Sequence, residues 1–189
     1  MDNPNLVLVI DMLKGFHDMG KLANPRTAKI ISAVRELLER RVERDGWKVV
    51  FLGDQHERGD KEFKIFPEHC ILGTEEVEII DELKRFLGVN DSPVLIPKTR
   101  YDGFYNTYLD EVLSAMRPKM VIVVGVCTDI CVLYTAAGLR ERDYQVIVPK
   151  DCTETYSAPG HNAKRVKRLV YGHMKDILGV KVIKSQKEI

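Results

Sequence analysis

The chain has 189 residues, of which 29 are Lys or Arg and 28 are Asp or Glu, so its formal net charge is +1 and gives no electrostatic reason to expect a nucleic acid partner. No apolar segment reaches the roughly 18 residues that a membrane span needs, and the first residues, MDNPNLVLVID, lack the basic start and long apolar stretch of a signal peptide. Four cysteines in a chain of this length do not make a disulfide framework, so we expect the reducing environment of the cytoplasm. The length fits one domain over residues 1–189, and we expect no membrane partner.

Short apolar runs and longer amphipathic segments alternate along the chain. The continuous apolar run Leu6–Ile10 predicts a strand that is buried on both faces. Apolar residues then recur with helical period, which predicts a helix over Thr27–Arg44. The other predicted strands are Lys48–Leu52, Pro93–Pro97, Met120–Val126, Gln145–Pro149 and Val180–Ile183, and the other predicted helices are Val77–Phe86, Tyr108–Met116, Asp129–Arg142 and His161–Tyr171. This alternation predicts an α/β protein with three layers, α/β/α, around a six-stranded, mainly parallel sheet.

Three chemically useful side chains follow predicted strands. Asp11 comes after the first strand, Lys98 after the third, and Cys131 just after the fourth. Parallel sheets place their chemistry at the carboxyl ends of the strands. There an aspartate can act as a general base, a lysine can lower the pKa of a thiol, and a helix N-terminus favours a thiolate and can stabilise an oxyanion. The shared edge therefore favours a nucleophilic cysteine.

Each of these residues also has an ordinary interpretation. Asp11 can be a strand-end cap, Lys98 a solvated surface residue, and Cys131 a small buried apolar residue. A redox pair with Cys127 is less favoured, because the spacing is not C-x-x-C. A structural zinc site needs about four ligands, and there is no second close cysteine pair.

The segment Gly53–Gly73 is too long for a plain connection, and such loops are usually functional. Asp54 and His56 are spaced so that they point the same way in an extended chain. With Glu62 and His69 they offer nitrogen and oxygen ligands that suit Zn²⁺, Fe²⁺ or Mn²⁺. Asp60 and Glu68 are further possible ligands, and a polar surface loop is the simplest alternative.

Several motifs together resemble one known family. They are LVLVIDMLKGF, GDQH, FPEHCILGT, PKTRYDGFYNTYLD and VVGVCTDICVLYTA. On these motifs the chain resembles the isochorismatase-like cysteine hydrolases, and most of all the nicotinamidase/pyrazinamidase group. The resemblance implies an isochorismatase-like fold with Rossmann-like strand order, a homo-oligomer, and hydrolysis of a small amide, nicotinamide, to nicotinate and ammonia through a cysteine thioester.

The resemblance also assigns roles to residues. It implies a catalytic triad of Asp11, Lys98 and Cys131, an oxyanion hole from the backbone N–H groups of Cys127 and Cys131, and a cis peptide bond between Val126 and Cys127. It implies one divalent transition metal, zinc first and iron or manganese next, on Asp54, His56 and His69 with Glu62 as a fourth ligand. Phe16 and Phe66 match aromatic residues that flank the pyridine ring, and Tyr101 is expected in the pocket wall.

Three positions depart from the family pattern. Leu13 stands where the family often has a polar residue, Phe66 where many nicotinamidases have tryptophan, and Cys127 where alanine is usual. A related amidase acting on a carbamoyl or ureido group, like N-carbamoylsarcosine amidase, and a non-catalytic binding protein of the same fold therefore remain alternatives. The sequence leaves open the metal's identity and whether Asp11 or the metal activates the water that releases the product.

Overall fold

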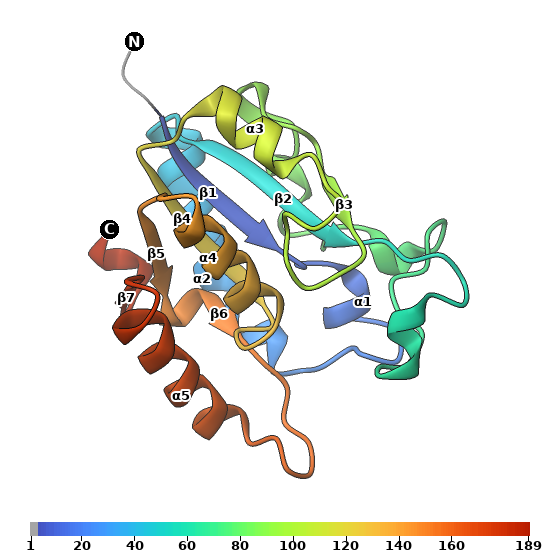
Figure 1. Cartoon of the computed structure of the whole chain (residues 1–189). Helices are drawn as coiled ribbons and strands as arrows, with labels where there is room; N and C mark the ends of the chain where they lie inside the picture. Colours follow the sequence, from blue (N-terminus) through green and yellow to red (C-terminus); the bar gives the residue numbers. More distant parts are fainter. Residues whose placement is uncertain (1–3) are drawn as a thin grey trace.

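The computed structural model describes residues 4–189, in which seven strands form one sheet of order β3-β2-β1-β4-β5-β7, with β6 paired to the end of β4 (Figure 1). The strands are β1 Asn5–Ile10, β2 Lys48–Asp54, β3 Ile96–Lys98, β4 Met120–Val126, β5 Val146–Pro149, β6 Thr153–Glu154 and β7 Lys181–Ile183. Every ladder between them is parallel. The prediction of six strands was one short, because β6 has only two residues and no pattern of its own.

The helices cover both faces of this sheet (Figure 1). They are α1 Lys14–His17, α2 Ile31–Leu38, α3 Leu109–Met116, α4 Cys131–Glu141 and α5 Ala163–Asp176, with single-turn helices at Thr27–Ile30, Glu39–Arg44, Lys61–Lys64, Glu75–Val77, Lys84–Phe86, Val89–Asp91, Lys150–Cys152 and Gln186–Glu188. Within residues 4–189, none of the helices has the length and apolar character to cross a membrane.

Two apolar cores lie on opposite faces of the sheet. Val7 and Val9 of β1 pack with α2 on one face. Leu6 and Leu8 pack with α3, α4 and α5 on the other. Because both faces of β1 are buried after its first residue, Leu6–Ile10 is apolar throughout rather than alternating. The predicted three-layer α/β/α architecture is confirmed.

The predicted helix over Val77–Phe86 was wrong. Only the backbone around Ile79 is extended, beside the segment that follows β1, so that Lys14 N donates to Glu78 O at 2.8 Å and Ile80 N donates to Met12 O at 3.1 Å. These bonds occupy backbone groups that a helix would need. The residues after Ile80 form turns and the single-turn helix Lys84–Phe86. The apolar residues of the segment are nevertheless buried, so their spacing reflected burial rather than a helix.

Other predicted boundaries moved by a few residues. The third strand lies at Ile96–Lys98 instead of Pro93–Pro97, and the helix predicted from Asp129 begins at Cys131. Thr27–Arg44 is helical throughout, although its first and last turns are not α-helical. The new position of β3 matters, because its register with β2 places Lys98 opposite Asp54.

Candidate active site

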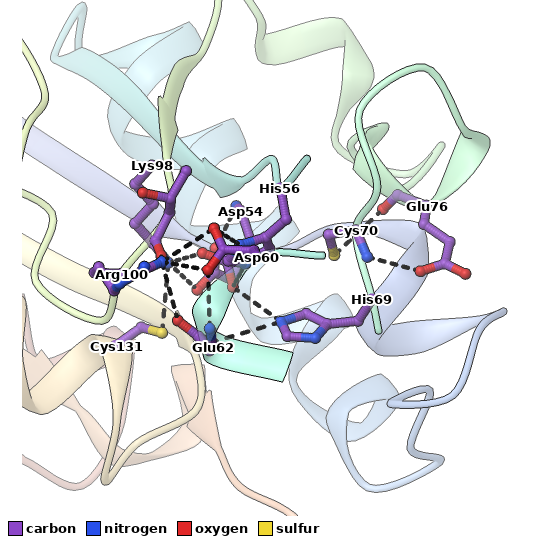
Figure 2. Close-up of polar contacts among 12 residues, drawn as sticks. Asp54, His56, Asp60, Glu62, His69, Cys70, Glu76, Lys98, Arg100 and Cys131 are labelled. Atoms are coloured by element: carbon purple, nitrogen blue, oxygen red, sulfur yellow. Dashed lines mark hydrogen bonds and ion pairs between the residues drawn. The ribbon is translucent and has the colours of Figure 1, made fainter. Parts of the chain in front are cut away.

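Asp11, Lys98 and Cys131 meet at the carboxyl edge of the sheet. Asp11 directly follows β1, Lys98 is the last residue of β3, and Cys131 is the first residue of α4. Lys98 Nζ lies 2.9 Å from Asp11 Oδ2. The same nitrogen lies 3.5 Å from Cys131 Sγ and also contacts Asp54 (Figure 2). One buried ammonium group therefore links the three predicted triad members with the first predicted metal ligand.

The backbone of Asp11 fixes its carboxylate. Its φ is +53°, in a region that aspartate tolerates better than most residues, and its N–H donates to Leu52 O of β2 at 2.9 Å. Asp54 N donates to Asp11 Oδ1 at 3.1 Å, which leaves Oδ2 for Lys98. The hydrogen bonds of Asp11 to β2 thus position the candidate base before any substrate binds.

The charges of this group are almost completely buried. Burial and the nearby Asp54 carboxylate raise the pKa of Asp11 to about 6, although Lys98 opposes the shift. Burial alone would lower the pKa of Lys98, but its attraction to Asp11 and Asp54 outweighs this effect and holds the pKa well above its usual value. Lys98 is therefore a permanent cation in the site.

The environment of the Cys131 thiol disfavours its ionised form. Burial raises its pKa well above the usual value, and Lys98 lowers it only in part, while Asp11 and Asp54 raise it further. The thiol is therefore protonated at rest, and a base must remove its proton. A carboxylate oxygen of Asp11 lies within 4.8 Å of Cys131 Sγ, so Asp11 is the residue placed to do so.

The turn before α4 presents free backbone donors. The Val126–Cys127 peptide bond is cis, as the resemblance implied. Ile130 N and Val132 N both donate to Cys127 O, at 3.1 and 3.2 Å, and Thr128 N donates to Glu154 O. Across residues 4–189, the hydrogen bonds of the backbone leave the N–H groups of Cys127 and Cys131 without an acceptor. These two donors are available to an oxygen bound beside Cys131.

The four predicted metal ligands form one buried cluster. Asp54, His56, Glu62 and His69 each offer a ligand atom, and these atoms all lie within 4.8 Å of one another. His69 Nε2 is 3.7 Å from Asp54 Oδ2 and 3.9 Å from Glu62 Oε1, and His56 Nε2 is 3.8 Å from Asp54 Oδ2 (Figure 2). Tetrahedral ligands at zinc bond lengths are separated by roughly 3.4 Å, so small movements suffice.

Unpaired atoms show that this cluster fits a cation. His56 Nδ1 lies 3.3 Å from Asp60 Oδ2, and His69 Nδ1 lies 2.8 Å from Pro67 O, so both rings turn Nε2 toward the cluster. Among the described residues, His56 Nε2 and Glu62 Oε2 are buried without a hydrogen-bond partner. Leaving such a group unsatisfied costs about 1–3 kcal/mol. A bound divalent metal would satisfy these atoms.

The two other possible ligands lie outside the cluster. Asp60 is on the outer side of His56 and contacts its Nδ1 rather than the cluster. Glu68 is exposed. The structure therefore brings together the four residues that the resemblance singled out from the six in the loop.

A cavity of about 240 Å³ joins the two groups. Asp11 and Cys131 line it together with the metal cluster's Asp54, Glu62 and His69. Phe16, Phe66 and Tyr101 also line it, as does the backbone turn at Cys127. Leu13, one of the departures from the family pattern, is fully buried in the apolar core and does not line the cavity.

Sequence reasoning missed Tyr156 in the cavity wall. Its ring is stacked on His161, with centroids 4.0 Å apart, and His161 Nε2 lies 2.8 Å from Asp129 Oδ2. Asp129 belongs to the turn before α4, so this contact fastens the loop after β6 to the candidate nucleophile turn. His161 thus holds Tyr156 beside the turn that precedes α4. No periodicity marks Tyr156, because its position depends on this long-range contact.

Comparisons with known proteins show the family to which the chain belongs. The Isochorismatase domain model matches residues 5–173. Nicotinamidase 1 of Arabidopsis thaliana is 30% identical over 183 residues, which cover 85% of this chain and 73% of that protein. N-carbamoylsarcosine amidase of Thermoplasma acidophilum is 30% identical, with a TM-score of 0.82 over 98% of both chains. Pyrazinamidase of Pyrococcus horikoshii, solved in complex with zinc, is 25% identical, with a TM-score of 0.81 over 96% of this chain and 99% of that one. The chain is therefore a member of the isochorismatase family.

Proposed function

We propose that the chain is a cysteine amidohydrolase that converts nicotinamide to nicotinate and ammonia. The observation that carries this proposal is the single cavity at which Cys131, its neighbouring base Asp11, and the buried His and carboxylate cluster all meet. The likeness to Nicotinamidase 1 and to a zinc-bound pyrazinamidase supports the same substrate class.

In the first half of the reaction, Asp11 takes the proton of the Cys131 thiol as the sulfur attacks the carboxamide carbon. Lys98 offsets the negative charge that passes between these two groups. The carbonyl oxygen, now an oxyanion, accepts hydrogen bonds from the N–H groups of Cys127 and Cys131, each of which contributes about 3 kcal/mol. Asp11 returns the proton to the departing nitrogen, so that ammonia leaves and a thioester remains on Cys131.

In the second half, water replaces ammonia in the same position. Asp11 is again a carboxylate and takes a proton from the water, whose oxygen attacks the thioester carbon. The tetrahedral intermediate uses the same two N–H donors. It collapses to nicotinic acid, and the sulfur leaves with the proton that Asp11 carries, which restores the resting thiol. The carboxylic acid then gives its remaining proton to the solvent and is released as nicotinate.

The remaining residues bind and orient the substrate. Phe16, Phe66 and Tyr101 provide apolar and aromatic walls for a flat ring. Asp54, His56, Glu62 and His69 would hold one divalent metal, for which zinc is our choice. When bound, that metal would supply a Lewis acid for a ring nitrogen of the substrate.

A second candidate is hydrolysis of a carbamoyl or ureido amide. The likeness to N-carbamoylsarcosine amidase over 98% of both chains favours it. The triad chemistry would be unchanged, because an amide C–N bond is broken in both substrates. The difference would lie in the part of the substrate that meets Phe66 and the metal cluster.

Ammonia release from nicotinamide and from N-carbamoylsarcosine, with metal content measured on the same sample, separates the two. Rapid release from nicotinamide with about one metal per chain would support the proposal. Release from N-carbamoylsarcosine alone would move the chain to the second candidate. Release from neither substrate, together with no covalent adduct at Cys131 from an electrophilic amide analogue, would revive a non-catalytic role.

A further inference from the structure

The outer side of the metal cluster carries an ion pair that the proposed reaction does not use. Asp60 Oδ2 lies 3.3 Å from His56 Nδ1, and Asp60 Oδ1 lies 2.9 Å from Arg100 Nη1 (Figure 2). Asp60 Oδ1 also accepts a hydrogen bond from Glu62 N at 2.9 Å. One carboxylate thus contacts two of the four candidate ligands, the ring of His56 and the backbone of Glu62.

We infer that Asp60 and Arg100 are positioning residues that set the metal affinity of the cluster. The inference rests on the metal site of the proposed function. By accepting a hydrogen bond from His56 Nδ1, Asp60 fixes the tautomer whose lone pair is on Nε2, which is the nitrogen that faces the cluster. By capping the turn at Lys61–Lys64, Asp60 also fixes the backbone position of Glu62.

Arg100 holds Asp60 in this place from another part of the chain. It follows β3 and is two residues beyond Lys98, so the segment that delivers the triad lysine also reaches the metal loop. Its Nη1 is also 3.9 Å from Glu62 Oε2. The Arg100 side chain is one-third exposed and Asp60 is 13% exposed, so Arg100 can be replaced without opening a buried cavity.

The sign of the effect at Arg100 distinguishes positioning from simple electrostatics. A positive charge beside a cation site repels the cation, so its removal alone would tighten metal binding. If Arg100 acts by holding Asp60, its removal weakens metal binding instead. The two explanations therefore predict opposite changes for the same substitution.

The test measures Zn²⁺ affinity of metal-free protein by competition with a chromophoric chelator, and the visible absorption of the Co²⁺-loaded protein. The variants are Asp60→Asn, Arg100→Met, the double variant, and Glu57→Gln as a matched control, because Glu57 is an exposed carboxylate in the same loop. The two carboxylate oxygens of Asp60 face three donors, on His56, Glu62 and Arg100. An asparagine side chain would offer them only one acceptor oxygen. We expect Asp60→Asn to weaken Zn²⁺ binding by about 10–100-fold and to shift the Co²⁺ spectrum.

Arg100→Met should weaken binding by a smaller factor, Glu57→Gln should leave it unchanged, and the double variant should resemble Asp60→Asn, because the pair acts as one unit. An Asp60→Asn affinity equal to that of Glu57→Gln, or tighter binding by Arg100→Met, would overturn the inference. If Asp60→Asn does not fold, Arg100→Met decides. A wild-type protein that binds no Zn²⁺ would overturn this inference and the metal site together, whereas ammonia release would still test the cysteine chemistry.

Discussion

At the reacting sulfur, burial favours the protonated thiol, whereas the attack on the substrate needs the thiolate. Burial keeps the Cys131 thiol protonated, and the same burial raises the pKa of Asp11 to about 6. A base with a pKa near the working pH is well matched to a step in which it first takes and then returns a proton. The Lys98 ammonium group contacts both residues, so it stabilises the negative charge on Asp11 before proton transfer and on the sulfur after it.

The two cysteines of the turn should respond differently to substitution. Cys131→Ala removes the nucleophile and should abolish ammonia release while Zn²⁺ binding stays near normal, since Cys131 is not in the four-residue cluster. Cys127→Ala keeps the backbone N–H and should retain most of the turnover. Both are measured by ammonia release with metal content. Retained turnover in Cys131→Ala would contradict the proposed mechanism.

His17 on α1 should make the stability of the fold depend on pH. The residue is 6% exposed, and within residues 4–189 neither of its ring nitrogens has a hydrogen-bond partner. Burial lowers its pKa from 6.5 to about 4, although Glu82 opposes the shift. Between these values the unfolded chain binds a proton that the folded chain does not, so the free energy of unfolding falls as the pH falls.

The expected loss from this one group between pH 7 and pH 5 is about 2 kcal/mol. Urea unfolding of wild type and His17→Leu at both pH values checks it. The leucine variant should lose less stability by that amount, because every other titrating group is shared. The same pH dependence in both proteins would show that His17 is not held neutral.

At the level of elements, β1 and β4 approach each other at Gly125, just before the nucleophile turn. Its φ is +118°, and a Cβ there would lie 1.9 Å from Ile10 O. Gly125→Ala should therefore destabilise the fold by at least about 3 kcal/mol. Gly46→Ala is the control: its φ is also positive, but a Cβ would meet nothing within 4 Å, so about 1 kcal/mol is expected.

Urea unfolding of the two glycine variants gives this comparison directly. Equal losses at Gly125 and Gly46 would mean that backbone conformation matters and the contact with Ile10 does not. A larger loss at Gly125 would show that close strand approach supports the site, because Asp11 and the turn at Cys127 continue from these two strands.

The elements that sequence predicted well are those with a clear period. The apolar run at Leu6–Ile10 and the helical spacing from Ile30 to Val42 report burial of a strand on two faces and of a helix on one. Val77–Phe86 shows the limit of this method. Its apolar residues are buried, but their spacing cannot reveal that the backbone pairs with the segment after β1.

The candidate site was predictable where residues follow strands or match a motif, as Asp11, Cys131 and His69 do. The short contacts of Lys98 with Asp54 depend on the register of β2 and β3, which the sequence does not show. Tyr156 and Arg100 were missed for a similar reason. Each lies in a loop without a repeating pattern, which a long-range contact fixes at the site: His161 with Asp129 for Tyr156, and Arg100 with Asp60.

For the whole molecule, the sheet edge is what assembles the site. The strand order puts β1 between β2 and β4, so the residues that follow these three strands converge although they are far apart in sequence. Lys98 then joins them from β3, and the loop after β2 closes one side with the metal cluster. The stability of this edge should depend on the charge balance among its buried carboxylates and its one buried lysine.

Metal removal should therefore lower the stability of the whole fold. The cluster holds two buried carboxylates, Asp54 and Glu62, and a metal that binds only the folded chain stabilises it by mass action. With free Zn²⁺ at about 100 times its dissociation constant, the gain is about 2.7 kcal/mol, or roughly 5–10 °C for a chain of this size. Calorimetry of wild type and His69→Ala, each with and without Zn²⁺, makes the measurement. An equal shift in both would place the stabilising ion elsewhere, whereas a shift confined to wild type would tie the fold's stability to these ligands.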